Sequence, residues 1–307
     1  MLKVALIGCG RWGLNHLSVL SAMRDKGLID HITVADPSNE ARSAAELADE
    51  TTVSIQGLQF DFVILATPSN MHSQQARDLL SEGNHVLVEK PLGNCETEAA
   101  NVIATAREHG RILGVGLLLR FHPAIIMANQ MLNNGELGRI ETLRFVRRTQ
   151  RSAPPGGDVI ESLGVHAIDL MCHLMSESEP NNVSVEGDNL DSRIALEFPH
   201  GIEAIIDVAW GASKERRNIQ ITGSSGSLRI DLGIHDRAFL ISDGKEKEIF
   251  CESSCSPLEA ELMHMVRNVK RFNENKSWTP VPDYGAALRG VRWTERAKQN
   301  RFLSRPH

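Results

Sequence analysis

The first third of the chain alternates short apolar runs with stretches of helical periodicity. The apolar runs are residues 3–8, 31–36, 62–67 and 85–90, and each is followed by a segment long enough for a helix. The runs are apolar at successive positions, so both faces of the corresponding strands must be buried. Strands of this kind separated by helices form a parallel sheet with helices on either side. The sequence therefore predicts a doubly wound α/β domain, whose last strand is residues 111–116.

The pattern changes in the remainder of the chain. A long strand from Arg139 leads through a Pro/Gly turn at residues 154–157 to a helix over residues 158–175, and several strands follow. Runs of strands with segregated helices are typical of an α+β domain on a mostly antiparallel sheet. A chain of 307 residues is also long enough for two cores. We expect a first domain over residues 1–118 and a second over residues 119–307, with two helices closing the chain.

Composition excludes several classes of partner. A net charge of −6 argues against a nucleic-acid-binding surface. No apolar run approaches the roughly 18 residues that a membrane span requires. The first residues lack the pattern of a signal peptide, which predicts a cytoplasmic location.

The cysteines give no sign of a disulfide framework or a metal centre. The five cysteines are an odd, scattered set, which makes a disulfide framework unlikely. Cys251 and Cys255 are close in sequence but lack partners at zinc-finger spacing. We therefore expect no bound metal.

A glycine-rich turn joins the first strand to the first helix. Its sequence is GCGRWG, with Gly8, Gly10 and Gly13 separated by Cys9, Arg11 and Trp12. Glycine is needed here because the turn is tight and a pyrophosphate must approach the backbone closely at a helix N-terminus. A plain tight turn would have the same sequence, so a second signal is needed.

Asp36 supplies that second signal at the end of the second strand. It follows Gly13 by 23 positions, where a carboxylate can accept hydrogen bonds from a ribose diol. The same carboxylate repels a 2′-phosphate, so NAD is the expected cofactor. NADP is left open because Ser38 and Arg42 lie close to Asp36 in the sequence.

Two further strand ends fall on the same edge of the predicted sheet. Thr67, Pro68 and Asn70 follow the third strand, where they either contact the cofactor or simply form a turn and helix cap. Glu89 and Lys90 follow the fourth strand, directly before a proline. A lysine there can present a cation to a substrate hydroxyl, although in isolation it would be read as a surface lysine.

The helix over residues 158–175 carries a possible acid/base residue. At about 100° per residue, the side chains of Ser162, His166, Asp169 and His173 share one face of the helix. His166 is suited to proton transfer near neutral pH. A partly buried structural histidine and a His-Asp-His metal site are the alternatives, and the metal site lacks further support.

Four motifs in order, GCGRWG, ATPSNMH, HVLVEKP and GVHAID, followed by a strand-rich second domain, resemble the Gfo/Idh/MocA family. The resemblance implies a Rossmann domain plus an α+β domain with an open-faced sheet, a nicotinamide cofactor, and a sugar or polyol substrate. Residues 120–132 and 135–140 look most like the sugar and nucleotide-sugar dehydrogenase branch. The antiparallel sheet resembles the surface through which family members form homo-oligomers.

The resemblance also implies roles for individual residues. Lys90 and His166 match the catalytic lysine and histidine, with Lys90 and Glu89 near the cofactor. Ser162 stands where the family usually has an aspartate four residues before the histidine, a carboxylate that would support the imidazole.

Candidate substrate contacts gather at the start of the second domain and around the helix. They are Arg120, His122, Arg151, Ser162 and Asp169, together with Lys90 and His166. The strand that contains Arg144, Arg147 and Arg148 and leads to Arg151 could bind an anionic group of a substrate. A solvated, charged sheet face is the alternative interpretation.

These residues predict oxidation of a secondary hydroxyl, or reduction of the corresponding ketone, with hydride transfer to or from the nicotinamide. Lys90 would stabilise the reacting oxygen while His166 accepts the proton. Two alternatives stay open. One is a sensor or regulatory protein that binds NAD without turnover, suggested by Ser162, and the other is an eliminase or glycosidase that uses transient redox.

Overall fold

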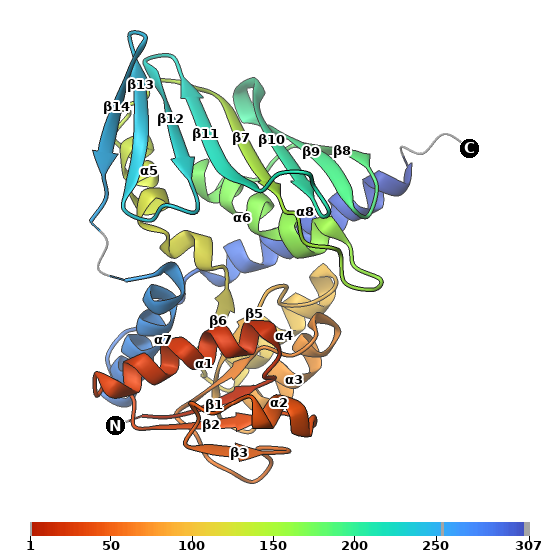
Figure 1. Cartoon of the computed structure of the whole chain (residues 1–307), viewed down its shortest axis with the longest axis vertical. Coiled ribbons are helices and arrows are strands. Elements are labelled where there is room, and N and C mark those ends of the chain that lie inside the picture. Colours follow the sequence, from red (N-terminus) through yellow and green to blue (C-terminus); the bar gives the residue numbers. More distant parts are fainter. Residues whose placement is uncertain (1, 253–254, 304–307) are drawn as a thin grey trace. The chain divides into compact units, whose positions relative to one another are not determined.

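The computed structural model describes residues 2–252 and 255–303, and the chain divides into two compact units. The first unit consists of Met1–Leu118 and Leu258–Leu288, and the second of Leu119–Pro257 and Arg289–His307. The sequence placed all residues beyond 118 in the second domain. Leu258–Leu288 instead belongs to the first unit by its contacts (Figure 1).

The first unit is built on a six-stranded parallel sheet in the order β3-β2-β1-β4-β5-β6. The strands are β1 (Lys3–Ile7), β2 (His31–Ala35), β3 (Glu50–Thr52), β4 (Phe62–Leu65), β5 (His85–Glu89) and β6 (Leu113–Gly116). Chain order reverses beside β1, which pairs with both β2 and β4. This reversal is the switch point at whose carboxyl edge doubly wound sheets bind ligands. The predicted parallel fold is confirmed, with β3 as an additional short edge strand.

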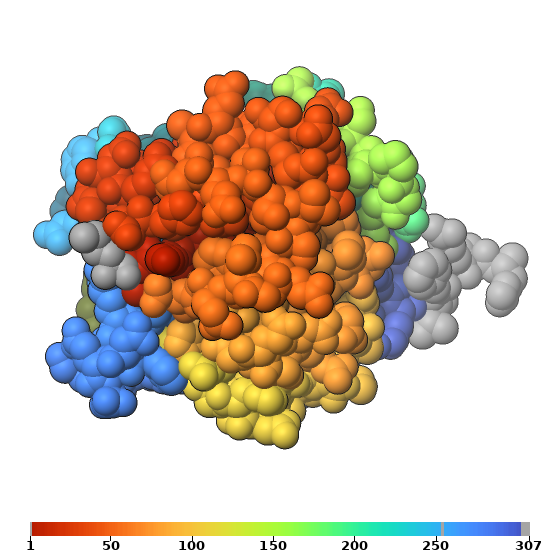
Figure 2. All heavy atoms as spheres, turned by 90° about the horizontal axis from the view of Figure 1, so that it is seen from below, coloured from red at the N-terminus to blue at the C-terminus, as the bar shows by residue number. Residues whose placement is uncertain are grey.

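The helices of this unit include one from the end of the chain. They are α1 (Arg11–Asp25), α2 (Asn39–Ser43), α3 (Ser69–Ser81), α4 (Glu96–Glu108) and α7 (Pro257–Asn273). Leu262, Met265, Val266 and Val269 of α7 recur at helical spacing and join the apolar core formed by β1, β2 and α1. Burial of that apolar stripe explains why this late segment belongs to the first unit. In Figure 2 the medium blue spheres at the lower left, which the colour bar assigns to α7, lie against the residues of the first unit.

The second unit is built on an eight-stranded sheet in the order β14-β13-β12-β11-β7-β10-β9-β8. The strands are β7 (Ile140–Arg148), β8 (Asn182–Gly187), β9 (Asp191–Phe198), β10 (Ile202–Ala209), β11 (Arg216–Gly223), β12 (Gly226–Asp231), β13 (Arg237–Ser242) and β14 (Lys245–Phe250). Neighbouring strands are antiparallel except for β7 and β10. The predicted mostly antiparallel sheet is therefore confirmed.

Helices cover one face of this sheet. They are α5 (Pro123–Asn133), α6 (Val165–Leu174) and the later part of α8 (Tyr284–Leu303) (Figure 1). The chain also forms two short helical turns, η1 (Leu118–Phe121) and η3 (Pro199–Gly201), the second of which joins β9 to β10. On β7, Leu143 and Phe145 face the apolar core, whereas Arg144 between them is exposed. This alternation is the signature of an antiparallel sheet with one solvated face.

The predicted helix over residues 158–175 is interrupted. A π-helical turn, η2 (Ile160–Gly164), precedes α6. Such turns shift the register of the side chains and occur often at functional sites. The side-chain positions expected from a regular helix therefore do not hold for Ser162. None of the described helices is long and apolar enough to cross a membrane.

Candidate functional site

The glycine turn between β1 and α1 has the geometry of a dinucleotide cradle. Gly8 has φ of +91°, and a Cβ on it would lie 2.7 Å from the carbonyl oxygen of Ala66. A Cβ on Gly13 would lie 2.1 Å from the carbonyl oxygen of Gly8. A Cβ on Gly10 would meet no atom of the described chain within 4 Å. Gly8 and Gly13 are thus required by the packing of the protein itself, and Gly10 borders open space.

The start of α1 suits a phosphate. Gly10 is the N-cap of this helix and offers no side-chain hydrogen bond to its first amides. Those amides, together with the positive end of the helix dipole, are available for an anionic ligand. The residues present therefore fit the pyrophosphate of a nicotinamide dinucleotide.

We expect Gly10→Ala to weaken NAD binding about tenfold or more while leaving the fold intact. The φ of −70° at Gly10 suits alanine, and the added methyl group would occupy the space that the pyrophosphate needs. Calorimetric titration with NAD measures the affinity, and thermal unfolding without cofactor measures the stability. Gly13→Ala is the matched control, which should lower stability even without NAD. NAD affinity equal to wild type in Gly10→Ala would refute this placement of the pyrophosphate.

Asp36 lies against the glycine turn. Its Oδ2 accepts a hydrogen bond from the backbone N–H of Cys9 at 2.8 Å, and its Oδ1 accepts one from the N–H of Ser38 at 2.8 Å. Arg42 is turned toward the backbone, where it donates to the carbonyl oxygens of Asp36 and Pro37 at 2.7 and 3.0 Å. The two main-chain donors hold the carboxylate in place beside the turn, as the prediction of ribose recognition requires.

The loop after β4 is tied to the loop after β5 by His72. His72 is buried, with Nδ1 2.8 Å from the carbonyl oxygen of Pro91 and Nε2 2.9 Å from that of Thr67. Pro68 is the N-cap of α3, and Asn70 lies in its first turn. The turn-and-cap interpretation thus describes the backbone here, while the cofactor contacts predicted for Thr67, Pro68 and Asn70 stay predictions. The motif ATPSNMH contained the signal, since its histidine falls one helical turn after the proline.

Glu89 points into the first unit. It is 5% exposed and accepts hydrogen bonds from the indole N–H of Trp12, from Nε2 of His16 at 2.8 Å and from the backbone N–H of Lys90 at 3.2 Å. A Cβ on Gly116 would lie 2.9 Å from the Glu89 carboxyl carbon, so only glycine fits beside it. The indole N–H of Trp12 and the Glu89 carboxylate thus bind each other, and the cofactor contacts predicted for Trp12 and Glu89 stay predictions.

The surroundings of Glu89 keep it ionised. Burial alone would raise its pKa, but the hydrogen bond and charge of His16, the hydrogen bond from Trp12 and the charge of Lys90 outweigh burial and lower it. An interaction between two charges is mutual, so the Glu89 carboxylate in turn stabilises the Lys90 ammonium.

The two predicted catalytic residues belong to different units. Lys90 lies directly after β5 in the first unit, and His166 lies in the first turn of α6 in the second. Ser162 lies in the π-helical turn before α6. The neighbouring carboxylate of Glu161 is bound by Lys298 of α8 at 2.7 Å.

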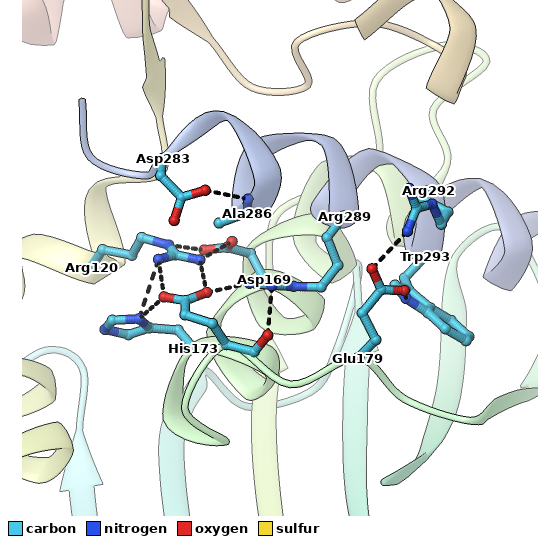
Figure 3. Close-up of polar contacts among 10 residues, drawn as sticks. Arg120, Asp169, His173, Glu179, Asp283, Ala286, Arg289, Arg292 and Trp293 are labelled. Atoms are coloured by element: carbon cyan, nitrogen blue, oxygen red, sulfur yellow. Dashed lines mark hydrogen bonds and ion pairs between the residues drawn. The ribbon is translucent and has the colours of Figure 1, made fainter. Parts of the chain in front are cut away.

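Arg120 and Asp169 form the centre of a buried charge cluster (Figure 3). Arg120 donates to Asp169 through Nε at 2.8 Å and Nη2 at 2.7 Å, and to Glu177 through Nη1 at 2.8 Å. His173 Nδ1 lies 2.7 Å from Glu177, and Arg289 donates to the same carboxylate and to the Glu177 carbonyl oxygen. Arg120 is 6% and Asp169 3% exposed. Arg120 and Asp169 thus bind each other, and the substrate contacts predicted for them stay predictions.

This cluster keeps Arg120 and Glu177 charged. Burial alone would lower the pKa of Arg120, but the Asp169 carboxylate holds it above its usual value. Burial alone would likewise raise the pKa of Glu177, but hydrogen bonds from His173 and Arg120 hold it well below its usual range. The charged forms of Arg120 and Glu177 are therefore stabilised by their partners within the cluster.

His122 is also structural in this arrangement. It is the N-cap of α5, where its Nδ1 accepts from the backbone N–H of Ala124 at 3.3 Å, and its ring packs edge-on against His235. Burial, with a contribution from His235, lowers the pKa of His122 to about 4. A neutral, 1% exposed imidazole is poorly placed for the predicted substrate contact.

The arginines expected to bind an anion are mostly paired. Arg151 is exposed, and its Nε donates to Thr149 Oγ1 at 3.3 Å. Each of the other three arginines has a carboxylate partner, in the pairs Arg144–Asp207, Arg147–Glu215 and Arg148–Asp191. The solvated, charged sheet face is therefore the better interpretation. No group of three or more metal-ligating side chains occurs in the part of the chain that the structure describes.

Comparison with known families agrees with this fold. Residues 2–117 match a family model described as an oxidoreductase family with an NAD-binding Rossmann fold, and residues 125–229 match the GFO/IDH/MocA C-terminal domain. The chain belongs to the Gfo/Idh/MocA family. It is accordingly an NAD-binding oxidoreductase by family, and the resemblance seen in its motifs is confirmed.

Individual relatives are distant. Inositol 2-dehydrogenase 2 of Saccharopolyspora erythraea is 28% identical over 57% of this chain and 54% of its own length, so the chain aligns with about half of that relative. A structure of UDP-N-acetylglucosamine 3-dehydrogenase from Acidithiobacillus ferrooxidans is 21% identical, with a TM-score of 0.81 over 98% of both chains. Levoglucosan dehydrogenase in complex with NADH and levoglucosan is 16% identical, with a TM-score of 0.82 over 98% of this chain and 97% of that one. The two structures share the fold of this protein.

Proposed function

We propose that this Gfo/Idh/MocA protein moves a hydride between NAD and a secondary hydroxyl or ketone of a sugar, polyol or nucleotide sugar. The observation that carries the proposal is the bond from Trp12, in the glycine turn, to Glu89, the residue before Lys90. This bond connects the end of β5 to the glycine turn within one unit. Lys90, the next residue, therefore lies at the edge of the sheet where the dinucleotide would bind.

The side chains have distinct roles in this mechanism. The nicotinamide, when bound, supplies the hydride acceptor or donor. Lys90 donates a hydrogen bond to the reacting oxygen and stabilises the negative charge that develops on it. His166 accepts the hydroxyl proton in oxidation and returns it in reduction. The relatives named for inositol and for UDP-N-acetylglucosamine support a substrate rich in hydroxyl groups.

Asp36 supports NAD over NADP. Its carboxylate is held beside the turn by two backbone amides and would repel a 2′-phosphate. Arg42 donates to main-chain oxygens on the same loop. A comparison of NAD and NADP affinities by calorimetry tests this preference, and equal affinities would contradict it.

The reaction is tested by following NADH absorbance with a panel of sugars, polyols and nucleotide sugars. Substrate-dependent NADH formation is expected with at least one class. Tight NAD binding without turnover on the whole panel would instead favour the sensor alternative, which rests on Ser162 in place of the family aspartate. Product formed without net NADH would favour elimination or glycoside cleavage through transient redox.

Two broader expectations from the sequence stay predictions. A cytoplasmic location agrees with five cysteines that form no disulfide within the described residues. A homo-oligomer agrees with the open face of the eight-stranded sheet, which carries mixed charges such as Arg144, Asp207 and Arg193. Sedimentation at micromolar concentration should give a mass above that of a monomer, and a monomer alone would contradict the homo-oligomer.

A further inference from the structure

Besides Glu89, a second glutamate is buried in the first unit. Glu261, on α7, is 2% exposed, and neither of its carboxyl oxygens has a hydrogen-bond partner among residues 2–252 and 255–303. Its neighbours on α7, Leu258, Leu262 and Met265, belong to the apolar core. An ionised carboxylate in such surroundings is costly, because burial removes its hydration and nothing replaces it.

Glu89 is the charged group that acts on Glu261. Burial and, after it, the negative charge of Glu89 raise the pKa of Glu261 well above its usual value. Glu89 has donors from Trp12, His16 and the N–H of Lys90, whereas Glu261 has none within the described residues. When two buried carboxyl groups interact, the group with fewer hydrogen-bond donors keeps its proton and the other ionises. The negative charge therefore belongs to Glu89 and the proton to Glu261.

The other titratable groups around this pair are few. From α1, His16 faces Glu89 through Nε2, and its buried Nδ1 has no hydrogen-bond partner in the described chain. From the end of β5 comes the ammonium of Lys90. On α7 itself, Glu259 is paired at 2.6 Å with Lys26, the C-cap residue of α1, and this pair is more exposed. The segment of β6 beside Glu89 is Leu113–Gly116 and contributes no ionisable side chain.

We propose that Glu261 is a positioning residue for Lys90, because as a neutral carboxylic acid it allows the adjacent Glu89 carboxylate to stay charged and in contact with the Lys90 backbone. This inference rests on the catalytic role proposed for Lys90. Loss of the proton from Glu261 would place two negative charges in one buried region. Their repulsion would displace Glu89 or α7 and disturb the strand end that carries Lys90.

The pH dependence of stability has a defined sign. A carboxyl group whose pKa is raised by folding contributes its full stability below the ordinary glutamate pKa, and this contribution is lost as pH rises toward the folded-state pKa. The wild-type protein should therefore lose stability as pH rises above the ordinary glutamate range. Glu261→Gln has nearly the same shape and cannot ionise, so it should lack that loss.

The test compares Glu261→Gln with Glu259→Gln, a change at the more exposed, Lys26-paired position of the same helix. We expect Glu261→Gln to move the alkaline fall in kcat upward by about one pH unit or more, and to remove the matching fall in thermal stability. Glu259→Gln should follow the wild type in both profiles. If stability responds in Glu261→Gln but the pH profile of kcat does not, Glu261 is a purely structural acid and the positioning role is wrong.

A measurement on the wild-type protein covers the case in which the variant fails to fold. Carbon-13 NMR of protein labelled at the glutamate carboxyl carbons should show one glutamate that ionises at clearly higher pH than the others. Ionisation of every glutamate in the ordinary glutamate range would overturn the proposal. This measurement and the stability profile need no substrate, so they are decided independently of whether the dehydrogenase activity is found.

Discussion

Replacing Lys90 by methionine is expected to lower kcat by about 10²-fold to 10⁴-fold, the range typical for loss of a positioned acid/base or charge-stabilising group. Methionine is similar in length but provides neither a charge nor a donor. The reacting oxygen would then develop negative charge without a cation beside it. Steady-state formation of NADH with the best substrate of the panel measures the effect.

The binding of NAD should change much less than kcat in this variant, because the glycine turn and Asp36 are untouched. Lys26→Met, a change at an exposed lysine of the same unit, is the control and should keep wild-type turnover. A Lys90→Met protein as active as wild type would rule out the catalytic role of Lys90.

The features set by local periodicity could be predicted from the sequence. The strands that form the parallel sheet are apolar on both faces, so their pattern is visible in short windows. The glycine turn could also be recognised from the sequence, because a side chain at Gly8 or Gly13 would clash with a backbone carbonyl oxygen. The position of Glu89 and Lys90 at the carboxyl edge of the sheet could be predicted because the strands are parallel.

The features set by packing over long sequence separations were not predictable. Arg120 and Asp169 are 49 positions apart, and nothing local distinguishes a buried ion pair from two surface charges. The apolar stripe of α7 could have covered either domain, and its place in the first unit depends on tertiary contacts. Glu261 looked like an ordinary polar position of an amphipathic helix, although it lies in the core. The π-helical turn before α6 likewise has no periodic signal, so a regular helix was assumed for Ser162.

The buried cluster around Arg120 makes a second large effect measurable. Arg120→Met is expected to lower the free energy of unfolding by about 3–5 kcal/mol, the usual cost of removing one partner from a buried ion pair. Asp169 is 3% exposed and would be left with an uncompensated negative charge. Chemical denaturation followed by tryptophan fluorescence measures the loss.

The pH dependence of the stability loss in Arg120→Met shows whether that loss comes from missing charge pairing or from missing packing. Glu177 has a lowered pKa in the folded protein, so its contribution to stability is present above the ordinary glutamate pKa and is lost as pH falls toward the folded-state value. The difference between wild type and Arg120→Met should therefore narrow in acid, where protonation relieves the unpaired carboxylates. A loss of packing alone would persist at low pH.

Two controls complete the test of the Arg120 cluster. Arg193→Met removes a half-exposed arginine 3.7 Å from Asp207 and should cost no more than about 1 kcal/mol. Adding Asp169→Leu to Arg120→Met should restore part of the lost stability, because it removes the orphaned charge. An Arg120→Met protein within about 0.5 kcal/mol of wild type at neutral pH would show that the cluster does not stabilise the second unit. Substrate contact by Arg120 would then again be the better explanation for this residue.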